Sequence, residues 1–125
     1  MNSRFSILAL ALACAAPAAC SRAAVLDPAP GDAYVRGPVE AVTHHATASR
    51  LLVRAGPGSR EPCGISATVD RRTRYLRREP SGTLGQTDRS ALSVGDTVEV
   101  HVDGAVAESC PVQARASFVV LVASP

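Results

Sequence analysis

Lysine and tryptophan are absent from this chain of 125 residues, and aromatic residues make up only 3% of it. Beyond residue 20, the aromatic side chains are Tyr34, Tyr75 and Phe118. Domains that bind single-stranded nucleic acid stack its bases on aromatic side chains in a basic groove. The formal net charge of +2 is also too small to create a strong field that collects nucleic acid. We therefore expect no nucleic-acid partner.

The apolar run near the start of the chain, residues 5–16, is too short to span a bilayer as a helix, which takes about 20 residues. It follows a polar start with one positive charge, Arg4, and it ends in small residues up to Cys20. This order is typical of a bacterial export signal. We expect residues 1–19 to be a signal peptide and the mature protein to work outside the cytoplasm.

Three processing sites fit the end of this segment. Cys20 follows two alanines and precedes Ser21, as a lipoprotein cysteine does, although Pro17 stands where a large aliphatic residue is usual. Lipid attachment at Cys20 would anchor the protein to a membrane. Cys14 is a second candidate for lipidation, and ordinary cleavage after Ala18 would release a secreted protein. Lipidation at Cys20 is the prediction that we carry forward.

Two cysteines remain beyond the signal, Cys63 and Cys110. In an exported chain, such a pair is expected to form a disulfide. The loop that it closes corresponds to a stabilisation of at most about 4 kcal/mol in the chain-entropy model. No histidine or further cysteine stands at ligand spacing from either cysteine, so we expect no metal site there.

The rest of the chain divides into a tether and one domain. Residues 20–36, which are rich in alanine and proline, are expected to hold the anchor cysteine and an extended tether. Residues 37–125 are expected to form the domain. Within it, strands are predicted at residues 38–45, 50–55, 63–70, 98–102 and 112–122.

Short turns connect these predicted strands. Residues 88–92 predict one helical turn, capped by Asp88 or Thr87. Residues 103–104 read Asp-Gly, which predicts a hairpin turn. The sequence holds no long amphipathic helix, so the pattern predicts an all-β domain, a small barrel or sandwich of five or six strands.

The alternation of side chains also predicts which of them face the core. In residues 63–70 these are Ile65, Ala67 and Val69. In residues 98–102 the valines alternate with Glu99 and His101, which we expect on the solvent face. The last strand is expected to carry one apolar face made of Val112, Ala114, Ala116, Phe118 and Val120.

Three motifs are shared with a known family. The first is a Gly-x-Val opening at Gly37 and Val39, and the second is Leu-x-Val-Gly-Asp-x-Val-x-Val, which begins at Leu92. The third and most specific resembles the family phrase Glu-Ser-Tyr-Pro-x-Gln-Ala. Its matching residues are Glu108, Ser109, Pro111, Gln113 and Ala114.

On these motifs, the chain from Gly37 onward resembles the YobA-like family of small bacterial exported proteins and lipoproteins of unknown function. The resemblance implies an OB-like barrel of five strands, with at most one short helical turn here, and it implies no known activity. Cys110 stands where the family tends to have tyrosine. This departure favours a disulfide with Cys63 that is particular to this branch.

One cluster of positive charge stands out in residues 71–78. The candidates for binding an anionic partner are Arg71, Arg72, Arg74, Tyr75, Arg77 and Arg78. A lipid headgroup, a phosphorylated envelope polymer or an acidic protein would suit them. The alternative is a solvated loop or an edge strand that its charges keep soluble.

The remaining polar groups predict no chemistry. His44 and His45 are neighbours and point to opposite faces of a regular strand, so we expect no metal site from them together with His101. Glu108, Asp103 and Glu99 could suggest an acid–base pair, but a solvent face is the ordinary place for such residues. Ser109, next to Cys110, has no strand–turn–helix elbow for a nucleophile. We expect no catalytic residue and no cofactor.

The function that these features favour is a non-enzymatic binding or accessory domain of the cell envelope. The expected partners are the membrane, through the lipid anchor, and an anionic envelope component or an envelope protein. Two alternatives stay open. One is a freely secreted redox or hydrolytic protein, which would need a reactive Cys63 or Cys110 or perturbed acids in a pocket. The other is a purely structural lipoprotein.

Overall fold

Seven strands and one short 3-10 turn make up residues 30–123, the part of the chain that the computed structural model describes. In chain order they are β1 (Val35–His44), β2 (Ser49–Val53), β3 (Ile65–Val69), β4 (Arg74–Arg78), β5 (Leu84–Gln86), η1 (Arg89–Ala91), β6 (Thr97–Val102) and β7 (Val112–Val122). The expected signal peptide, Cys14 and Cys20 lie outside the described residues. Among residues 30–123, no helix is long and apolar enough to cross a membrane.

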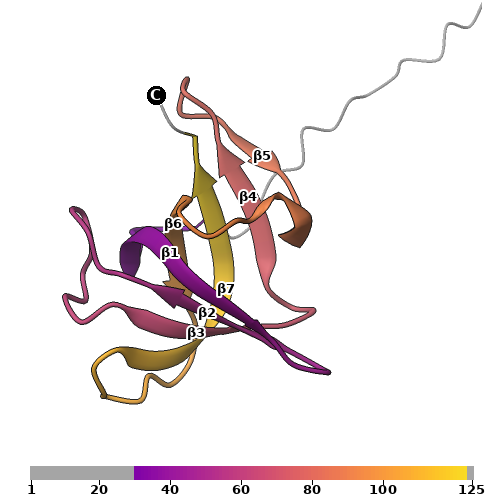
Figure 1. Cartoon of the computed structure of the whole chain (residues 1–125). Helices are drawn as coiled ribbons and strands as arrows, with labels where there is room; N and C mark the ends of the chain where they lie inside the picture. The colour runs from indigo at the N-terminus through magenta and orange to yellow at the C-terminus, as the bar shows by residue number, and fades with distance from the viewer. Residues whose placement is uncertain (1–29, 124–125) are drawn as a thin grey trace, which may run out of the picture.

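Five of the strands close into a barrel (Figure 1). Each of β1–β2, β2–β3, β1–β6 and β6–β7 is an antiparallel pair, and the parallel pair of β3 with β7 completes the ring. This closure, with β3 parallel to the last strand, is the arrangement of an OB-like barrel. The predicted all-β, OB-like fold is confirmed. The remaining strands, β4 and β5, extend the sheet beyond the outer side of β7.

The barrel interior follows the alternation in the sequence. Ile65, Ala67 and Val69 are all buried, as predicted, and they pack with the inward valines of the other strands. Close packing also explains Gly37, since a Cβ atom there would lie 1.9 Å from the carbonyl oxygen of Arg54. Only a residue without a side chain lets β1 approach the end of β2 so closely.

The domain begins slightly earlier than predicted. Val35 is fully buried and pairs with Val100 of β6, and Ala33 is buried as well. The backbone amide of Tyr34 donates a hydrogen bond of 2.9 Å to the carbonyl of Val100. The end of the expected tether is therefore part of the sheet, because its small apolar residues continue the pairing of β1 with β6.

A bulge divides β7 into two halves. Val102 of β6 pairs with Ala116, whereas His101, one residue earlier, pairs with Phe118. Ser117 is the extra residue, and its hydroxyl donates a 3.0 Å hydrogen bond to the carbonyl of His101. An extra residue in one strand turns the side chains that follow it to the opposite face.

The bulge corrects the prediction of a single apolar face on the last strand. Before it, Val112, Ala114 and Ala116 point into the barrel; after it, Val119 and Leu121 do so instead. The expectation that Phe118 and Val120 share the inner face is wrong. Both lie in an outer cluster with Leu76 of β4 and the half-buried Leu84 of β5.

The outer side of β6 is also covered. Glu99 and His101 are only 7% and 6% exposed, so the prediction that they face solvent is wrong. The ring of Phe118 meets the ring of His101 edge-on at 6.3 Å between centroids, and Arg78 reaches across to Glu99. The alternating pattern of β6 shows which side faces the barrel, and it carries no signal for what covers the other side.

The connections differ from the predictions in one place. The short helical turn is present as η1, and Asp88 caps it by accepting a 2.8 Å hydrogen bond from the amide of Ser90, as predicted. Gly104 has the positive φ of a turn. The link from β6 to β7 is nevertheless a long loop and not a two-residue hairpin, because β7 begins only at Val112.

Candidate ligand-binding groove

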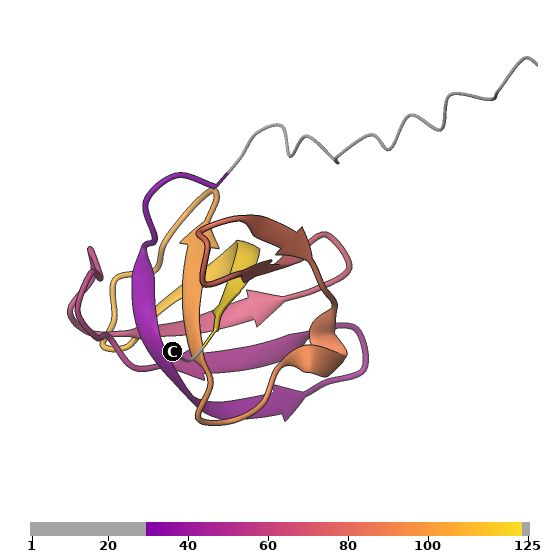
Figure 2. The same cartoon turned by 90° about the horizontal axis from the view of Figure 1, so that it is seen from above.

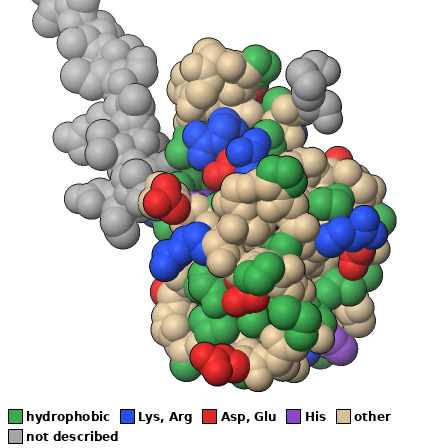
Figure 3. All heavy atoms as spheres, turned by 90° about the vertical axis from the view of Figure 1, so that its left-hand side faces the viewer, with side chains coloured by type: hydrophobic (Ala, Val, Ile, Leu, Met, Phe, Trp, Pro, Cys, Tyr) green, Lys and Arg blue, Asp and Glu red, His purple; other side chains and the backbone are tan. Residues whose placement is uncertain are grey.

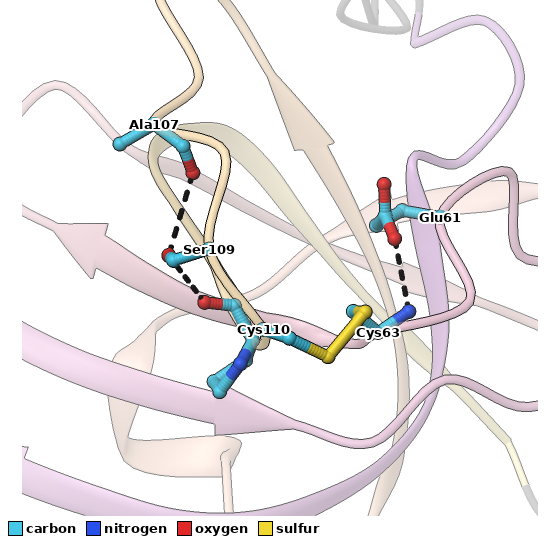
Figure 4. Close-up of a disulfide and its surroundings, with 6 residues drawn as sticks. Glu61, Cys63, Ala107, Ser109 and Cys110 are labelled. Atoms are coloured by element: carbon cyan, nitrogen blue, oxygen red, sulfur yellow. Dashed lines mark hydrogen bonds between the residues drawn. A yellow bond between two sulfur atoms is a disulfide. The ribbon is translucent and has the colours of Figure 1, made fainter.

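A disulfide joins Cys63 and Cys110, as predicted (Figure 4). The two Cα atoms are 5.1 Å apart. Each cysteine stands just before one strand of the parallel pair, whose first partners are Ile65 and Val112. This pair joins the two edges of the five-stranded sheet and so closes the barrel. The disulfide holds the two edges together at this seam, just before both strands begin.

Hydrogen bonds shape the two loops that carry the cysteines (Figure 4). The carboxylate of Glu61 accepts a 2.9 Å hydrogen bond from the amide of Cys63. The hydroxyl of Ser109 donates to the carbonyl of Pro111 at 2.7 Å. Both cysteine residues are exposed.

The structure divides the predicted anionic-partner cluster between two faces of β4. Arg74 and Arg78 share a face with the buried Leu76, whereas Tyr75 and Arg77 point to the other side. The guanidinium carbon of Arg74 lies 5.5 Å from the centroid of the Phe118 ring, a cation–π contact. The cluster in the sequence is therefore no single patch on the surface.

Two further members of the cluster have intramolecular partners. Arg78 donates hydrogen bonds of 3.0 and 3.1 Å to the two carboxylate oxygens of Glu99. Arg72 lies in the turn after β3, where its amide donates a 2.8 Å hydrogen bond to the carboxylate of Asp70. Arg78 in particular is held within the protein, which leaves Arg71 and Arg77 as the freer cations of the predicted set.

A groove of about 820 Å³ lies beside this segment, at one end of the barrel. Three connections meet there: the loop from β1 to β2, the turn from β3 to β4, and η1. Figures 1 and 2 both show these three connections on the same side of the barrel. The lining residues are His44, His45, Ala46, Thr47, Ala48, Val69, Asp70, Arg71, Thr73, Tyr75 and Arg89.

A chain of hydrogen bonds links three parts of the groove. The hydroxyl of Ser49, at the start of β2, lies 3.1 Å from Nδ1 of His44 at the end of β1. The guanidinium of Arg89, in η1, donates to the same hydroxyl at 3.4 Å. Ser49 is only 2% exposed, so its buried hydroxyl is a fixed hydrogen-bond partner for the two longer side chains that line the groove.

The charge of the groove is positive. Its one acidic side chain, Asp70, accepts hydrogen bonds of 3.0 and 3.3 Å from Arg115, which holds the pKa of that carboxyl below its usual range. Arg71 and Arg89 have no such acidic partner among the described residues. Figure 3 shows the opposite side of the molecule, where acidic and basic side chains are interspersed.

Tyr75 adds a neutral donor to the groove. Burial raises the pKa of its phenol, while the nearby charge of Arg89 acts in the opposite direction. Thr73 beside it is buried, and its hydroxyl donates to the carbonyl of Ala116 at 2.9 Å. At neutral pH, Tyr75 therefore keeps its O–H as a hydrogen-bond donor.

The contact of Ser49 with His44 resembles a nucleophile and its base, but its geometry does not suit catalysis. Ser49 is almost fully buried, and Arg89 donates to the oxygen that would attack. A serine nucleophile needs an exposed Oγ and a base that a further group orients. The arrangement suits positioning of side chains for binding.

A smaller hollow of about 330 Å³ lies on the outer face of the barrel sheet. Arg50 and Leu52 of β2, Ser66 of β3 and Gln113 of β7 line it, next to Cys110. In OB-folds this face commonly binds extended ligands. Here its lining has one cation and no aromatic side chain. The larger groove has more charged and hydrogen-bonding side chains, so it is the better candidate for a binding site.

Comparison with known proteins gives no match: no protein-family model, no curated protein and no solved structure matches the chain. The resemblance to the YobA-like family stays a prediction. The case for a binding site in the groove therefore rests on the geometry of the groove itself. The sequence predicts no metal site at His44 and His45, and nothing in it singles out Ser49 or Arg89 as site residues.

Proposed function

We propose that this protein is a non-enzymatic binding domain of the cell envelope, anchored to a membrane by a lipid on Cys20. The groove at the barrel end carries the proposal, because it brings together Arg71 and Arg89 from two connections and the histidines of a third, around one acid that is already paired. Its expected partner is an anionic envelope component. The disulfide supports a place outside the cytoplasm, since such bonds persist in oxidising compartments.

The proposal is tested by sedimentation of the purified protein with washed envelope fragments from the cells that produce it. We expect the wild-type protein to sediment with the fragments and the variant Arg71→Gln/Arg89→Gln to remain in solution. Arg74→Gln/Arg77→Gln is the matched control, because these exposed cations come from the predicted cluster but do not line the groove. Wild-type protein that stays in the supernatant would contradict the function itself.

The alternative of a secreted redox protein has one observation in its favour, the exposure of both Cys63 and Cys110. A redox-active disulfide exchanges readily with glutathione, whereas a structural one resists it. Equilibration with glutathione buffers, followed by alkylation and mass measurement, separates the two. If the disulfide is reduced and re-formed at the redox potentials of ordinary glutathione buffers, the redox function would be favoured over a purely structural disulfide.

A further inference from the structure

We propose that the groove binds a tetrahedral oxyanion, the phosphate or sulfate group of a larger ligand. This inference rests on the proposed function and names the chemistry of the partner. Arg71, Arg89, His44 and His45 are the groups that would hold it, with Tyr75 as an additional donor.

The first argument is the direction from which the donors come. Arg71 stands in the turn after β3, Arg89 in η1, and His44 and His45 at the end of β1. Donors thus surround the hollow on several sides. A planar carboxylate is satisfied by one guanidinium fork, whereas a tetrahedral group offers oxygens in several directions. The groove therefore suits phosphate or sulfate better than carboxylate.

The second argument is that part of the site is already positioned. The Ser49 hydroxyl is buried and contacts both the His44 ring and the Arg89 guanidinium. When it accepts from Arg89, its own proton is free for Nδ1 of a neutral His44. The other ring nitrogen, Nε2, then carries a proton that it can donate to a ligand. A donor held in place before binding loses less conformational entropy when the ligand arrives.

The third argument concerns charge and size. Asp70 is the acid of the groove, and its carboxylate is already engaged by Arg115 at 3.0 and 3.3 Å. The positive side chains therefore have no acid within the groove that is free to neutralise them. The hollow of about 820 Å³ is of the size that holds whole small-molecule ligands. A phosphate or sulfate group would occupy only part of it, which leaves room for the rest of the ligand along Ala46, Ala48 and Val69.

The test is a titration of the purified protein with pyrophosphate at constant ionic strength, followed by calorimetry and by amide chemical shifts. We expect saturable binding by the wild-type protein and affinity at least about tenfold weaker for Arg71→Gln and for Arg89→Gln, since each removes a charge-assisted hydrogen bond. Arg60→Gln is the control, an exposed arginine that does not line the groove, and it should bind as the wild type does. Absent or non-saturable binding by the wild type overturns the inference.

A second variant, Arg89→Lys, tests positioning without a risk to the fold, because Arg89 is exposed. Lysine keeps the charge but lacks the planar fork that reaches Ser49 and a ligand oxygen together. We expect it to lose most of the affinity that Arg89→Gln loses. Wild-type affinity in Arg89→Lys would show that charge alone suffices and would overturn the positioned site.

The ligand source and chemistry are separated by further titrants. Acetate at the same ionic strength should not compete with pyrophosphate, and equal competition overturns the preference for tetrahedral groups. Glycerol phosphate and vesicles containing phosphatidylglycerol distinguish a soluble phosphate ester from a lipid headgroup, and binding of either supports the inference. If the protein sediments with envelope fragments but does not bind pyrophosphate, this inference is overturned while the proposed function stays intact.

Discussion

Residues 30–123 hold two hydrophobic clusters, which differ in how they are built. The larger lies inside the barrel, where residues such as Leu51 and Ile65 are enclosed by all five barrel strands. The smaller lies outside, where Leu76 of β4 packs with Phe118 and Val120 of β7 and with the half-buried Leu84 of β5. Alternation along each strand builds most of the inner cluster, and the bulge in β7 brings Val119 and Leu121 into it. The outer one depends on a bulge, an added hairpin and a set of polar contacts at its rim.

Two buried leucines allow the clusters to be compared directly. Leu51, in the barrel interior, is 0% exposed, and Leu76, in the outer cluster, is 1% exposed. We expect Leu51→Ala to lower the free energy of unfolding by about 3–5 kcal/mol and Leu76→Ala by about 2–3 kcal/mol, because a site near the surface collapses more easily around the cavity. Urea unfolding measures both, with the half-buried Leu52→Ala as the control of smallest effect. A larger loss for Leu76→Ala would reverse the ranking of the two clusters.

Removal of the disulfide should affect the barrel seam more than the outer cluster. For Cys63→Ser/Cys110→Ser we expect a loss of about 2–4 kcal/mol, since the open chain regains conformational entropy when it unfolds. Hydrogen exchange measures the effect: amides that exchange only by global unfolding should exchange faster in every strand, and those of β3 and β7 should show an additional acceleration because the seam is no longer held. Equal acceleration in β3, β7, β4 and β5 would contradict a local role of the disulfide at the seam.

The ion pair of Arg78 with Glu99 stabilises the rim of the outer cluster. Glu99→Gln should lower the free energy of unfolding by about 1–3 kcal/mol, because it leaves the guanidinium with a weaker, uncharged acceptor in a partly buried place. A double-mutant cycle with Arg78→Gln separates their coupling from the separate effect of each change. A coupling energy near zero would mean that the pair contributes nothing to the rim.

The smallest predicted effect is a pH dependence from His101. Burial lowers the pKa of its imidazole, while the charge of Glu99 opposes this, the charge of Arg78 adds to it, and Asp32 also opposes it. In the unfolded chain the imidazole takes up a proton near its ordinary pKa of about 6.5, whereas in the folded protein its pKa is lower. Stability is therefore fully present above this pH and falls as the pH drops below it, by at most about 1.4 kcal/mol per pH unit for one proton.

His101→Phe tests this dependence, because a planar aromatic ring is kept while the titratable group is lost. Unfolding measured between pH 7 and pH 5 should show a shallower slope in the variant than in the wild type. His44 and His45 are present in both proteins, so the difference between the two slopes reports the change at position 101 alone. An unchanged slope would show that His101 does not titrate with folding.

The two clusters also differ in how well the sequence predicts which of their residues are buried. Alternation of Ile65, Ala67 and Val69 predicts their burial, because a strand with one covered face repeats every two residues. Ser117 gives no such signal, because the bulge that it forms depends on how β6 and β7 pair across a long loop. The burial of Glu99 and His101 was missed for the same reason, since what covers them comes from β4 and β7.

The candidate site was less predictable than the fold. The charges of residues 71–78 were visible in the sequence, but Arg74 and Arg78 turn to the outer cluster while Arg71 lines the groove. Arg89 and Ser49 come together with His44 only in three dimensions. Composition shows how many cationic side chains a chain has, but the topology determines which of them lie close together.

The central claim is that this protein works outside the cytoplasm as an anchored, disulfide-closed binding domain. Its most direct test is the intact mass of the protein recovered from the membranes of the cells that produce it, with and without reductant and an alkylating agent. We predict a mass that begins at Cys20 and carries an acylglycerol group, with Cys63 and Cys110 alkylated only after reduction. A full-length mass with both of these thiols freely alkylated would contradict the account.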